Sequence, residues 1–336
     1  MRNTDPKGRA VVTGILPRRT LLRSLGTAPL AIGGARAQSA YPDRPIRVIV
    51  PYAAGGGTDV TARAATQRLT TELGQQMPVD NRTGANTAIA AEYVARSRPD
   101  GHTLFVSGST TFVLLPLLSQ RLPFRPGDFA PVSQLTRFPM ACVVNSTVQG
   151  GFPEIVARIQ RAPSEFLYAH TGIGSSGHLM GERLFMNHGL RLTSVPYRGF
   201  APTLVDMMAG QIPMTFESVP AVMPFHRDGR VRIVAVSSPE RWPALPDVPT
   251  FRELGYGSMA FHGWFGMVAP AGTPAAIVDR LSQAVAKISA DPGYRAAIDA
   301  TGQQVVHNSP EDFASLIAEE TGEWRKVIEP LNIRLD

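Results

Sequence analysis

Residues 46–59 read IRVIVPYAAGGGTD, an apolar run that ends in a proline, a tyrosine and a cluster of three glycines. The run Ile46–Val50 predicts a short buried strand, and the apolar spacing over Asp59–Leu73 predicts a helix directly after the glycines. A strand, a tight turn and a helix in this order form the first half of a βαβ unit. This stretch therefore predicts an α/β fold.

The same alternation of strand and helix continues along the chain. It favours mostly parallel sheets with helices on both faces. In such sheets ligands bind beyond the carboxyl ends of the strands, so the loops that follow strands are the places to search for a site. The further strands are expected at Thr103–Ser107, Ala141–Asn145, Phe166–Ala169, Thr193–Pro196, Met214–Glu217 and Ile233–Ser237, and the further helices at Ile155–Arg161, His178–His188, Pro202–Ala209 and Ala275–Ile288.

The loop Tyr52–Asp59 has the composition of an anion cradle. Its glycines, Gly55, Gly56 and Gly57, allow backbone N–H groups to turn toward a ligand, and the N-terminus of the following helix favours a negative charge. The loop lacks the Gly-Lys-Ser/Thr sequence of a Walker A motif. Asp59 is expected to cap the start of the helix. On spacing alone, a ligand cradle and a purely structural tight turn remain equally open.

The loop Thr171–His178 also lies between a strand and a helix. Its glycines at 172, 174 and 177 formally fit the G-x-G-x-x-G fingerprint of dinucleotide-binding folds, but the acidic residue expected about 20 positions later is missing. The next strand ends at Tyr197-Arg198, and an arginine could serve NADP, so this alternative stays open. Ser175 and Ser176 do not stand in the G-x-S-x-G turn of a nucleophilic serine. His178 is more simply explained as a polar residue at a helix start than as a catalytic base.

Residues 1–37 have the layout of an export signal. A basic stretch ends in Arg18-Arg19, an apolar run follows, and the small residues Ala35 and Ala37 stand where a signal peptidase reads the chain. The paired arginines resemble a twin-arginine signal. Cleavage near Ala37 and a location in the periplasm are therefore expected. Downstream, the sequence contains no apolar run of the about 18 residues that a membrane span requires.

The basic character of the chain belongs to this leader. The full sequence has 33 Lys and Arg against 27 Asp and Glu, and residues 1–37 contain seven of the basic and one of the acidic residues, which leaves 26 of each. Because a nucleic-acid-binding domain normally has a basic surplus of its own, nucleic acid is not an expected partner. The one cysteine, Cys142, lies in an apolar run and is expected to be buried. The histidines have no metal-ligand spacing, so no metal site is predicted.

Short motifs lie in a fixed order over essentially the whole mature chain, which at about 300 residues is long enough for two domains. They are residues 50–59 (VPYAAGGGTD), 81–85 (NRTGA), 98–104 (RPDGHTL), 128–132 (DFAPV), 174–179 (GSSGHL), 195–199 (VPYRG), 244–250 (ALPDVPT) and 264–274 (WFGMVAPAGTP). In this combination the chain resembles the Bug-type substrate-binding receptors of tripartite tricarboxylate transporters.

The resemblance implies a type II periplasmic-binding-protein fold, in which two α/β lobes are joined by two crossovers and close on a ligand. Residues 41–140 plus 265–336 then form the first lobe, and residues 141–264 form the second. The resemblance further implies a monomeric receptor without cofactor or enzymatic activity, a small carboxylate as ligand, and membrane transporter subunits as partners. The positions expected to bind the ligand are Tyr52, Ala54, Gly55, Gly56, Gly57, Thr58, Asp59, Ser109, Thr110, Gly174, Ser175, Ser176, His178 and Glu217, with no catalytic residue among them.

Two segments depart from the family pattern. Where the family usually has Gly-Gly-Asn-Ile-Gly, this chain has the side chains of Asn86-Thr87-Ala88-Ile89-Ala90. The family's Phe-Asp in the second lobe is here Phe216-Glu217, one methylene longer. Both departures are expected to affect the size and contacts of the ligand.

Two other functions remain open from the sequence. A periplasmic sensor of the same fold, reporting to a membrane kinase, would need the same binding chemistry as a transport receptor. An NAD(P)-dependent oxidoreductase would instead use the glycines of residues 172–177.

Overall fold

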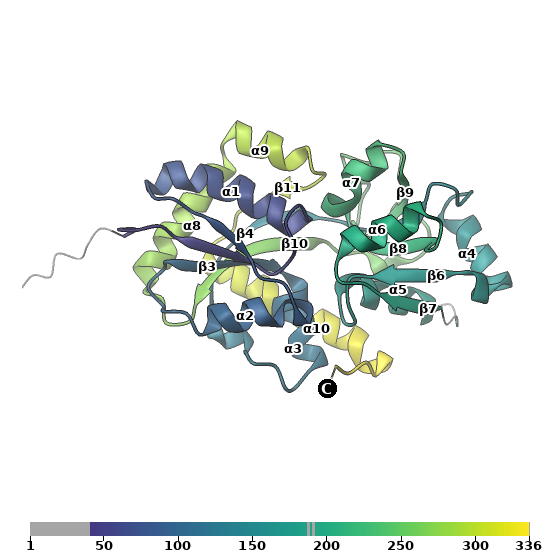
Figure 1. Cartoon of the computed structure of the whole chain (residues 1–336), viewed down its shortest axis with the longest axis horizontal. Helices are drawn as coiled ribbons and strands as arrows, with labels where there is room; N and C mark the ends of the chain where they lie inside the picture. The colour runs from purple at the N-terminus through teal and green to yellow at the C-terminus, as the bar shows by residue number, and fades with distance from the viewer. Residues whose placement is uncertain (1–40, 187–188, 190–191, 336) are drawn as a thin grey trace, which may run out of the picture. The chain divides into compact units, whose positions relative to one another are not determined.

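The computed structural model describes residues 41–186, 189 and 192–335, which form two β-sheets with helices packed against them (Figure 1). The expected export signal, residues 1–37, lies outside the described residues, as do the last two residues of the helix expected over His178–His188. We call the six-stranded sheet with its helices the first lobe, and the five-stranded sheet with its helices the second lobe.

The sheet of the first lobe has the strand order β11-β4-β10-β3-β1-β2. Its strands come from two distant parts of the chain, since β10 and β11 follow the whole second lobe in sequence. The strands are β1 (Arg47–Val50), β2 (Val79–Asn81), β3 (Thr103–Gly108), β4 (Phe129–Phe138), β10 (Gly263–Pro270) and β11 (Gln304–Val305). The helices are α1 (Gly57–Leu73), α2 (Ala88–Ala95), α3 (Leu115–Leu118), α8 (Ala275–Ser289), α9 (Pro292–Asp299) and α10 (Pro310–Leu331), with the short turns η1 (Ala85–Thr87), η2 (Thr110–Leu114) and η3 (Pro126–Asp128).

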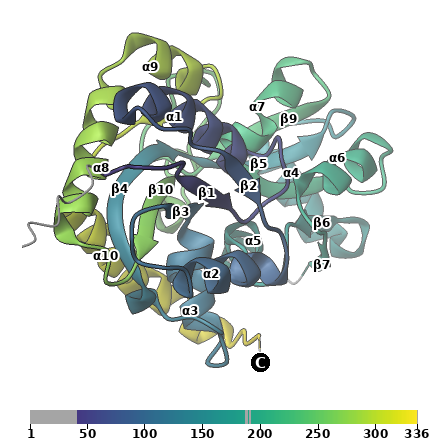
Figure 2. The ribbon, with the colours of Figure 1, turned by 60° about the vertical axis from the view of Figure 1, so that its left-hand side comes forward.

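Strand β1 is buried on both faces because its side chains alternate between two cores. Val48 and Val50 belong to the core under α1, α8 and α9, whereas Ile49 belongs to the core under α2, α3 and α10. Figure 2 shows α1 and α9 on one side of β1 and β3, and α2 and α3 on the other. The position of β1 between β3 and β2 fixes where its carboxyl end, and therefore the loop after it, is located.

The sheet of the second lobe has the order β7-β6-β8-β5-β9. Its strands also alternate between two cores, with Cys142 facing α4 and α5 and Val143 facing α6 and α7. The strands are β5 (Met140–Asn145), β6 (Leu167–His170), β7 (Thr193–Pro196), β8 (Met214–Ser218) and β9 (Val231–Val236). The helices are α4 (Phe152–Arg161), α5 (Ser176–Met186), α6 (Phe200–Met208) and α7 (Val219–Arg227), with η4 (Pro163–Glu165) and η5 (Gly257–Met259).

The chain passes between the lobes twice, and these passages make both sheets mixed. Strand β4 continues through Pro139 into β5, and the segment between β9 and β10 returns to the first lobe. The pairs β1–β2, β1–β3, β6–β7 and β6–β8 are parallel, but β10 pairs antiparallel with β3 and β4, β11 with β4, and β5 with β8 and β9. The expectation of mostly parallel sheets is therefore wrong. The strands on which the chain enters a new lobe, β5 and β10, run against the strands of the βα units.

The expected type II fold of two α/β lobes is confirmed, and every strand and helix expected from the sequence is present within a few residues of its expected bounds. Cys142 is buried, as expected. In the described part of the chain, no helix is long and apolar enough to cross a bilayer.

Candidate functional site

The loop between β1 and α1 is held in place by the carboxylate of Asp59, which is only 2% exposed. This carboxylate accepts hydrogen bonds from the backbone N–H of Gly55, from Nε of Arg63 and from Nδ2 of Asn81, each at 2.9 Å. Burial opposes ionisation of Asp59, but the three hydrogen bonds outweigh it and lower the pKa. The expected capping role of Asp59 is wrong, because the N-cap residue is Gly56. Asp59 lies in the first turn of α1, and its side chain reaches back into the loop.

Because Gly56 has no side chain, the first N–H groups of α1 receive no side-chain cap. This end of α1 also lies close to the second lobe. A Cβ atom at Gly57 would stand 3.2 Å from the ring of Pro220 in α7. Ala54 and Gly55 are exposed at the tip of the loop, whereas Thr58 is buried. The loop therefore presents a positive helix end to the space between the lobes.

Side chains from both lobes meet beside this loop. The phenol of Tyr52 forms a hydrogen bond with the side chain of Thr110, and Oγ1 of Thr110 lies 3.3 Å from Oγ of Ser176 at the start of α5. Burial raises the pKa of Tyr52 to about 12; the Thr110 hydrogen bond opposes this shift, and the Glu217 carboxylate adds to it. Tyr52 and Thr110 of the first lobe and Ser176 and Glu217 of the second lobe are thus brought together.

Glu217 extends from β8 of the second lobe. Its Oε1 accepts hydrogen bonds from the backbone N–H of Ser218 at 2.7 Å and from Oγ of Ser218 at 2.9 Å. Burial raises the pKa of Glu217, although both hydrogen bonds act in the opposite direction. Glu217 therefore brings an acidic group of weakened acidity to the place where the lobes meet.

The loop between β6 and α5 is organised by two histidines. The N–H of Gly174 donates to Nδ1 of His178 at 3.2 Å, and the N–H of His178 donates to Oγ of Ser175 at 3.3 Å. The N–H of Gly172 donates to Nδ1 of His170 at 3.3 Å. Burial lowers the pKa of both imidazoles to about 4, and His178 further lowers that of His170. Ser175 and His178 therefore shape the loop through their hydrogen bonds to its backbone.

Ser109 is directed to a partner that sequence reasoning missed. Its Oγ donates to Oε1 of Glu320 in α10 at 2.7 Å, and the same carboxylate accepts from the indole N–H groups of Trp264 and Trp324. Glu320 lies more than two hundred residues away in sequence and carries no local motif. Of the two adjacent polar candidates, Thr110 lies beside the second lobe and Ser109 is bonded to α10.

The segment 86–90, expected from the sequence to affect the ligand, forms a direct contact between the lobes. Nδ2 of Asn86 donates to the carbonyl of Ile173 at 3.1 Å. Three successive non-glycine residues here, Ala85, Asn86 and Thr87, have positive φ values of 45°, 48° and 83°. Such values favour glycine, so these three residues have a costly backbone conformation. The side chain of Asn86 is thereby placed against the loop of the second lobe.

Neither of the two loops contains a lysine or an arginine. Arg63 is paired with Asp59. Arg82 donates to Asp80 at 3.0 Å and lies over the ring of Tyr93, whereas Arg198 is exposed. Within the described residues there is also no cluster of three His, Cys, Asp or Glu side chains that could hold a metal ion. The arrangement suits an anion held by N–H and hydroxyl groups.

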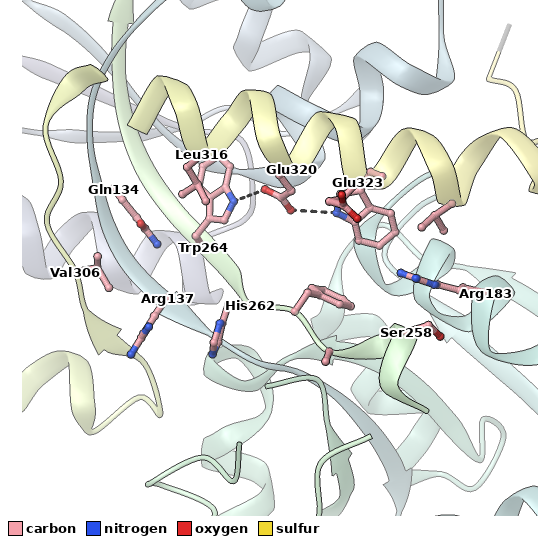
Figure 3. Close-up of a pocket in the computed structure, with 14 residues that line it drawn as sticks. Gln134, Arg137, Arg183, Ser258, His262, Trp264, Val306, Leu316, Glu320 and Glu323 are labelled. Atoms are coloured by element: carbon pink, nitrogen blue, oxygen red, sulfur yellow. Dashed lines mark hydrogen bonds between the residues drawn. The ribbon is translucent and has the colours of Figure 1, made fainter. Parts of the chain in front are cut away.

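A cavity of ≈ 400 Å³ lies elsewhere in the structure, behind Glu320 (Figure 3). It is lined by residues of α10, of β4, of α5 and of the segment before β10, and by none of the fourteen positions expected to bind the ligand. The Glu320–Ser109 hydrogen bond described above links this lining to the end of β3. We therefore treat the two places as separate.

Comparison with known proteins agrees with this geometry. The sequence model of the family described as "Tripartite tricarboxylate transporter family receptor" matches residues 61–333. The protein BugT of Bordetella pertussis is 33% identical to this chain over 88% of this chain and 91% of its own length.

Two similar solved structures contain a named carboxylate. A protein of Rhodopseudomonas palustris solved with adipate is 31% identical, with a TM-score of 0.84 over 88% of this chain and 99% of that one. MatC of the same species, solved with bound malate, is 32% identical, with a TM-score of 0.80 over 86% of this chain and 100% of that one.

Proposed function

Because this chain belongs to the family of tripartite tricarboxylate transporter receptors, we propose that it captures a small carboxylate between its two lobes and presents it to the membrane subunits of a transporter. The resemblance seen in the sequence is thus confirmed. The observation that carries the proposal is the convergence of Tyr52 and Thr110 with Ser176 and Glu217 from opposite lobes. The malate and adipate bound by the two structural relatives support a carboxylate as the ligand class.

The ligand carboxylate is held by neutral donors. The uncapped N-terminus of α1 supplies backbone N–H groups, the start of α5 supplies more, and Thr110 and Ser176 supply hydroxyl groups. Hydrogen bonds to a charged group are worth about 1.5–3 kcal/mol each, so several of them replace an ion pair. Tyr52 forms one wall of the site, and Glu217 sets its far limit in the second lobe.

We further propose that the chain acts as a monomer and has no enzymatic activity. Both histidines of the second loop accept hydrogen bonds from backbone N–H groups through Nδ1, and Ser175 accepts one from His178. His170, His178 and Ser175 therefore have structural partners within their own loop. In these hydrogen bonds neither histidine acts as a base for the serine hydroxyl. Failure of NAD and NADP at millimolar concentration to raise the melting temperature would agree with this proposal, because a cofactor that binds the native state stabilises it.

Loss of the Ser176 hydroxyl should weaken binding of the carboxylate about tenfold, which corresponds to about 1.4 kcal/mol for one hydrogen bond to a charged group. The measurement is calorimetric titration of Ser176→Ala with whichever of malate or adipate binds the unmodified protein. Arg82→Ala and Arg198→Ala should cost less, because Arg82 is engaged by Asp80 and Arg198 is exposed. Circular dichroism should show that all three variants are folded. Loss of binding in either arginine variant, with Ser176→Ala unaffected, would contradict a site built from neutral donors.

We also propose that the chain is exported to the periplasm and cleaved after Ala37. The small residues Ala35 and Ala37 precede this bond at the two positions that a signal peptidase reads. The intact mass of periplasmic protein should correspond to a chain that begins at Gln38. Recovery of the complete chain from the cytosol alone would argue against export.

A further inference from the structure

The cavity behind Glu320 is formed by both lobes. Residues of α10 and β4 in the first lobe line one side, and Arg183 of α5 lines the other, with Ala260 and His262 from the segment that returns to the first lobe (Figure 3). Its volume of ≈ 400 Å³ lies in the range of small-molecule sites, about 300–1,000 Å³. An occupant would therefore contact both lobes at once.

The acidic residues in this lining are already engaged. Glu320 accepts from Ser109 at 2.7 Å and from the indole N–H groups of Trp264 and Trp324. Glu323 is bonded to Lys326 at 2.7 Å at the surface. Both carboxylates thus have hydrogen-bond partners within the protein, which reduces their repulsion of an anion in the cavity.

The cationic groups of the lining are in a different situation. In the described part of the chain, neither Arg137 nor Arg183 forms a salt bridge; the hydrogen bond from Nε of Arg137 goes to the neutral Oε1 of Gln304 at 2.9 Å. Burial lowers the pKa of Arg183, which Glu323 only partly offsets, and burial together with Arg137 lowers the pKa of His262. In Figure 3, Arg137 and His262 lie at one end of the cavity and Arg183 at the other. The two arginines favour an anion, whereas His262, with its lowered pKa, adds no full positive charge at neutral pH.

The rest of the lining is apolar and aromatic. Trp324 packs edge to face against Phe261, with ring centroids 5.4 Å apart, and Leu316 and Val327 complete the surface of α10. Since the indole N–H groups of Trp264 and Trp324 are both used by Glu320, the tryptophans offer only carbon to an occupant. Such a surface suits a flat apolar ring.

We propose that this cavity is a second ligand site, separate from the site between the glycine loops, and that it binds a small aromatic carboxylate. The carboxylate lies by Arg183 and the ring lies against Trp324 and Phe261. The site does not depend on the proposed transport function, because none of its lining residues belongs to the two loops.

Benzoate is a suitable probe, and tryptophan fluorescence is a suitable readout. The chain has three tryptophans, Trp242, Trp264 and Trp324, and the last two line the cavity. Benzoate should change the emission saturably, and the neutral analogue benzyl alcohol should bind at least about tenfold more weakly, because a charge-assisted hydrogen bond is missing. Equal binding of both probes, or no saturable change with benzoate, would overturn the proposal.

Two variants locate the binding. Arg183→Gln removes the cation, and Ala260→Phe fills the cavity; each should weaken benzoate binding at least about tenfold. The controls are Arg158→Gln, an arginine of the second lobe outside the cavity, and Ser176→Ala, which changes the other site. Both controls should bind benzoate as the unmodified protein does. Loss of benzoate binding in Ser176→Ala would place the probe between the glycine loops and overturn the second site, as would full binding by both cavity variants.

Discussion

Replacing Gly177 by alanine is expected to destabilise the second lobe by about 3 kcal/mol or more and to abolish tight binding of the carboxylate. A Cβ atom at Gly177 would stand 2.2 Å from the carbonyl oxygen of Phe216 in β8 and 3.2 Å from its carbon. The obstacle is backbone of a strand bonded on both sides, so it cannot move aside. The start of α5, with Ser176, must then shift away from β8, which changes the position of Ser176 relative to Thr110.

The measurement is chemical denaturation together with calorimetric titration. Gly322→Ala is the matched control, because Gly322 lies in the interior of α10 with no atom within 4 Å of the added Cβ. Alanine there should stabilise the protein by about 0.5–1 kcal/mol, as it does in an unobstructed helix. If the Gly177→Ala variant has the same unfolding free energy and the same ligand affinity as the unmodified protein, the close approach of α5 to β8 is wrong.

The protein should lose stability as the pH falls from about 6.5 to about 4, through the buried histidines of the second loop. His170 is 0% exposed and His178 is 7% exposed, and burial lowers the pKa of each to about 4. Each Nδ1 accepts a backbone N–H and must therefore be unprotonated. In this pH range the unfolded chain binds more protons than the folded chain, so acid favours unfolding, by on the order of 3 kcal/mol per histidine.

Two buried carboxyls act in the opposite sense. The raised pKa values of Glu217 and Glu320 mean that these groups bind a proton more tightly in the folded than in the unfolded protein. Their contribution to the unfolding free energy is therefore lost as the pH rises above the ordinary range of glutamate. The histidine effect is isolated by variants. His170→Gln with His178→Gln should reduce the dependence of the unfolding free energy on pH between 6.5 and 4, whereas His307→Gln, at an exposed position, should leave it unchanged. An equally steep acid loss in the double variant would contradict neutral buried imidazoles.

The βα units could be predicted because their signals are local. The apolar run before Pro51 and the glycines after it specify a strand, a turn and the start of a helix through residues that are neighbours in sequence. The observed elements begin and end close to the expected residues. The two glycine loops could be singled out for the same reason. Their convergence came from the family resemblance, because no local pattern indicates which strands share a sheet.

What the sequence did not indicate depends on contacts between distant residues. The antiparallel strands β4 and β10 are neighbours in the sheet, although the whole second lobe lies between them in sequence. Their relative direction therefore follows from the route of the chain. Glu320 meets Ser109 across 211 positions, and nothing near it in sequence marks it. The positive φ values at Ala85, Asn86 and Thr87 could not be expected either, because none of these residues is a glycine.

The central claim is that the mature protein binds a small carboxylate, and a thermal-shift titration of the chain from Gln38 with mono-, di- and tricarboxylates tests it most directly. At least one carboxylate should raise the melting temperature progressively with concentration, since a ligand at a hundred times its Kd stabilises the native state by about 2.7 kcal/mol. That same carboxylate should have a smaller effect on Ser176→Ala. Absence of any shift with all three classes at millimolar concentration, or an equal shift in Ser176→Ala, would contradict a carboxylate receptor built on the two glycine loops.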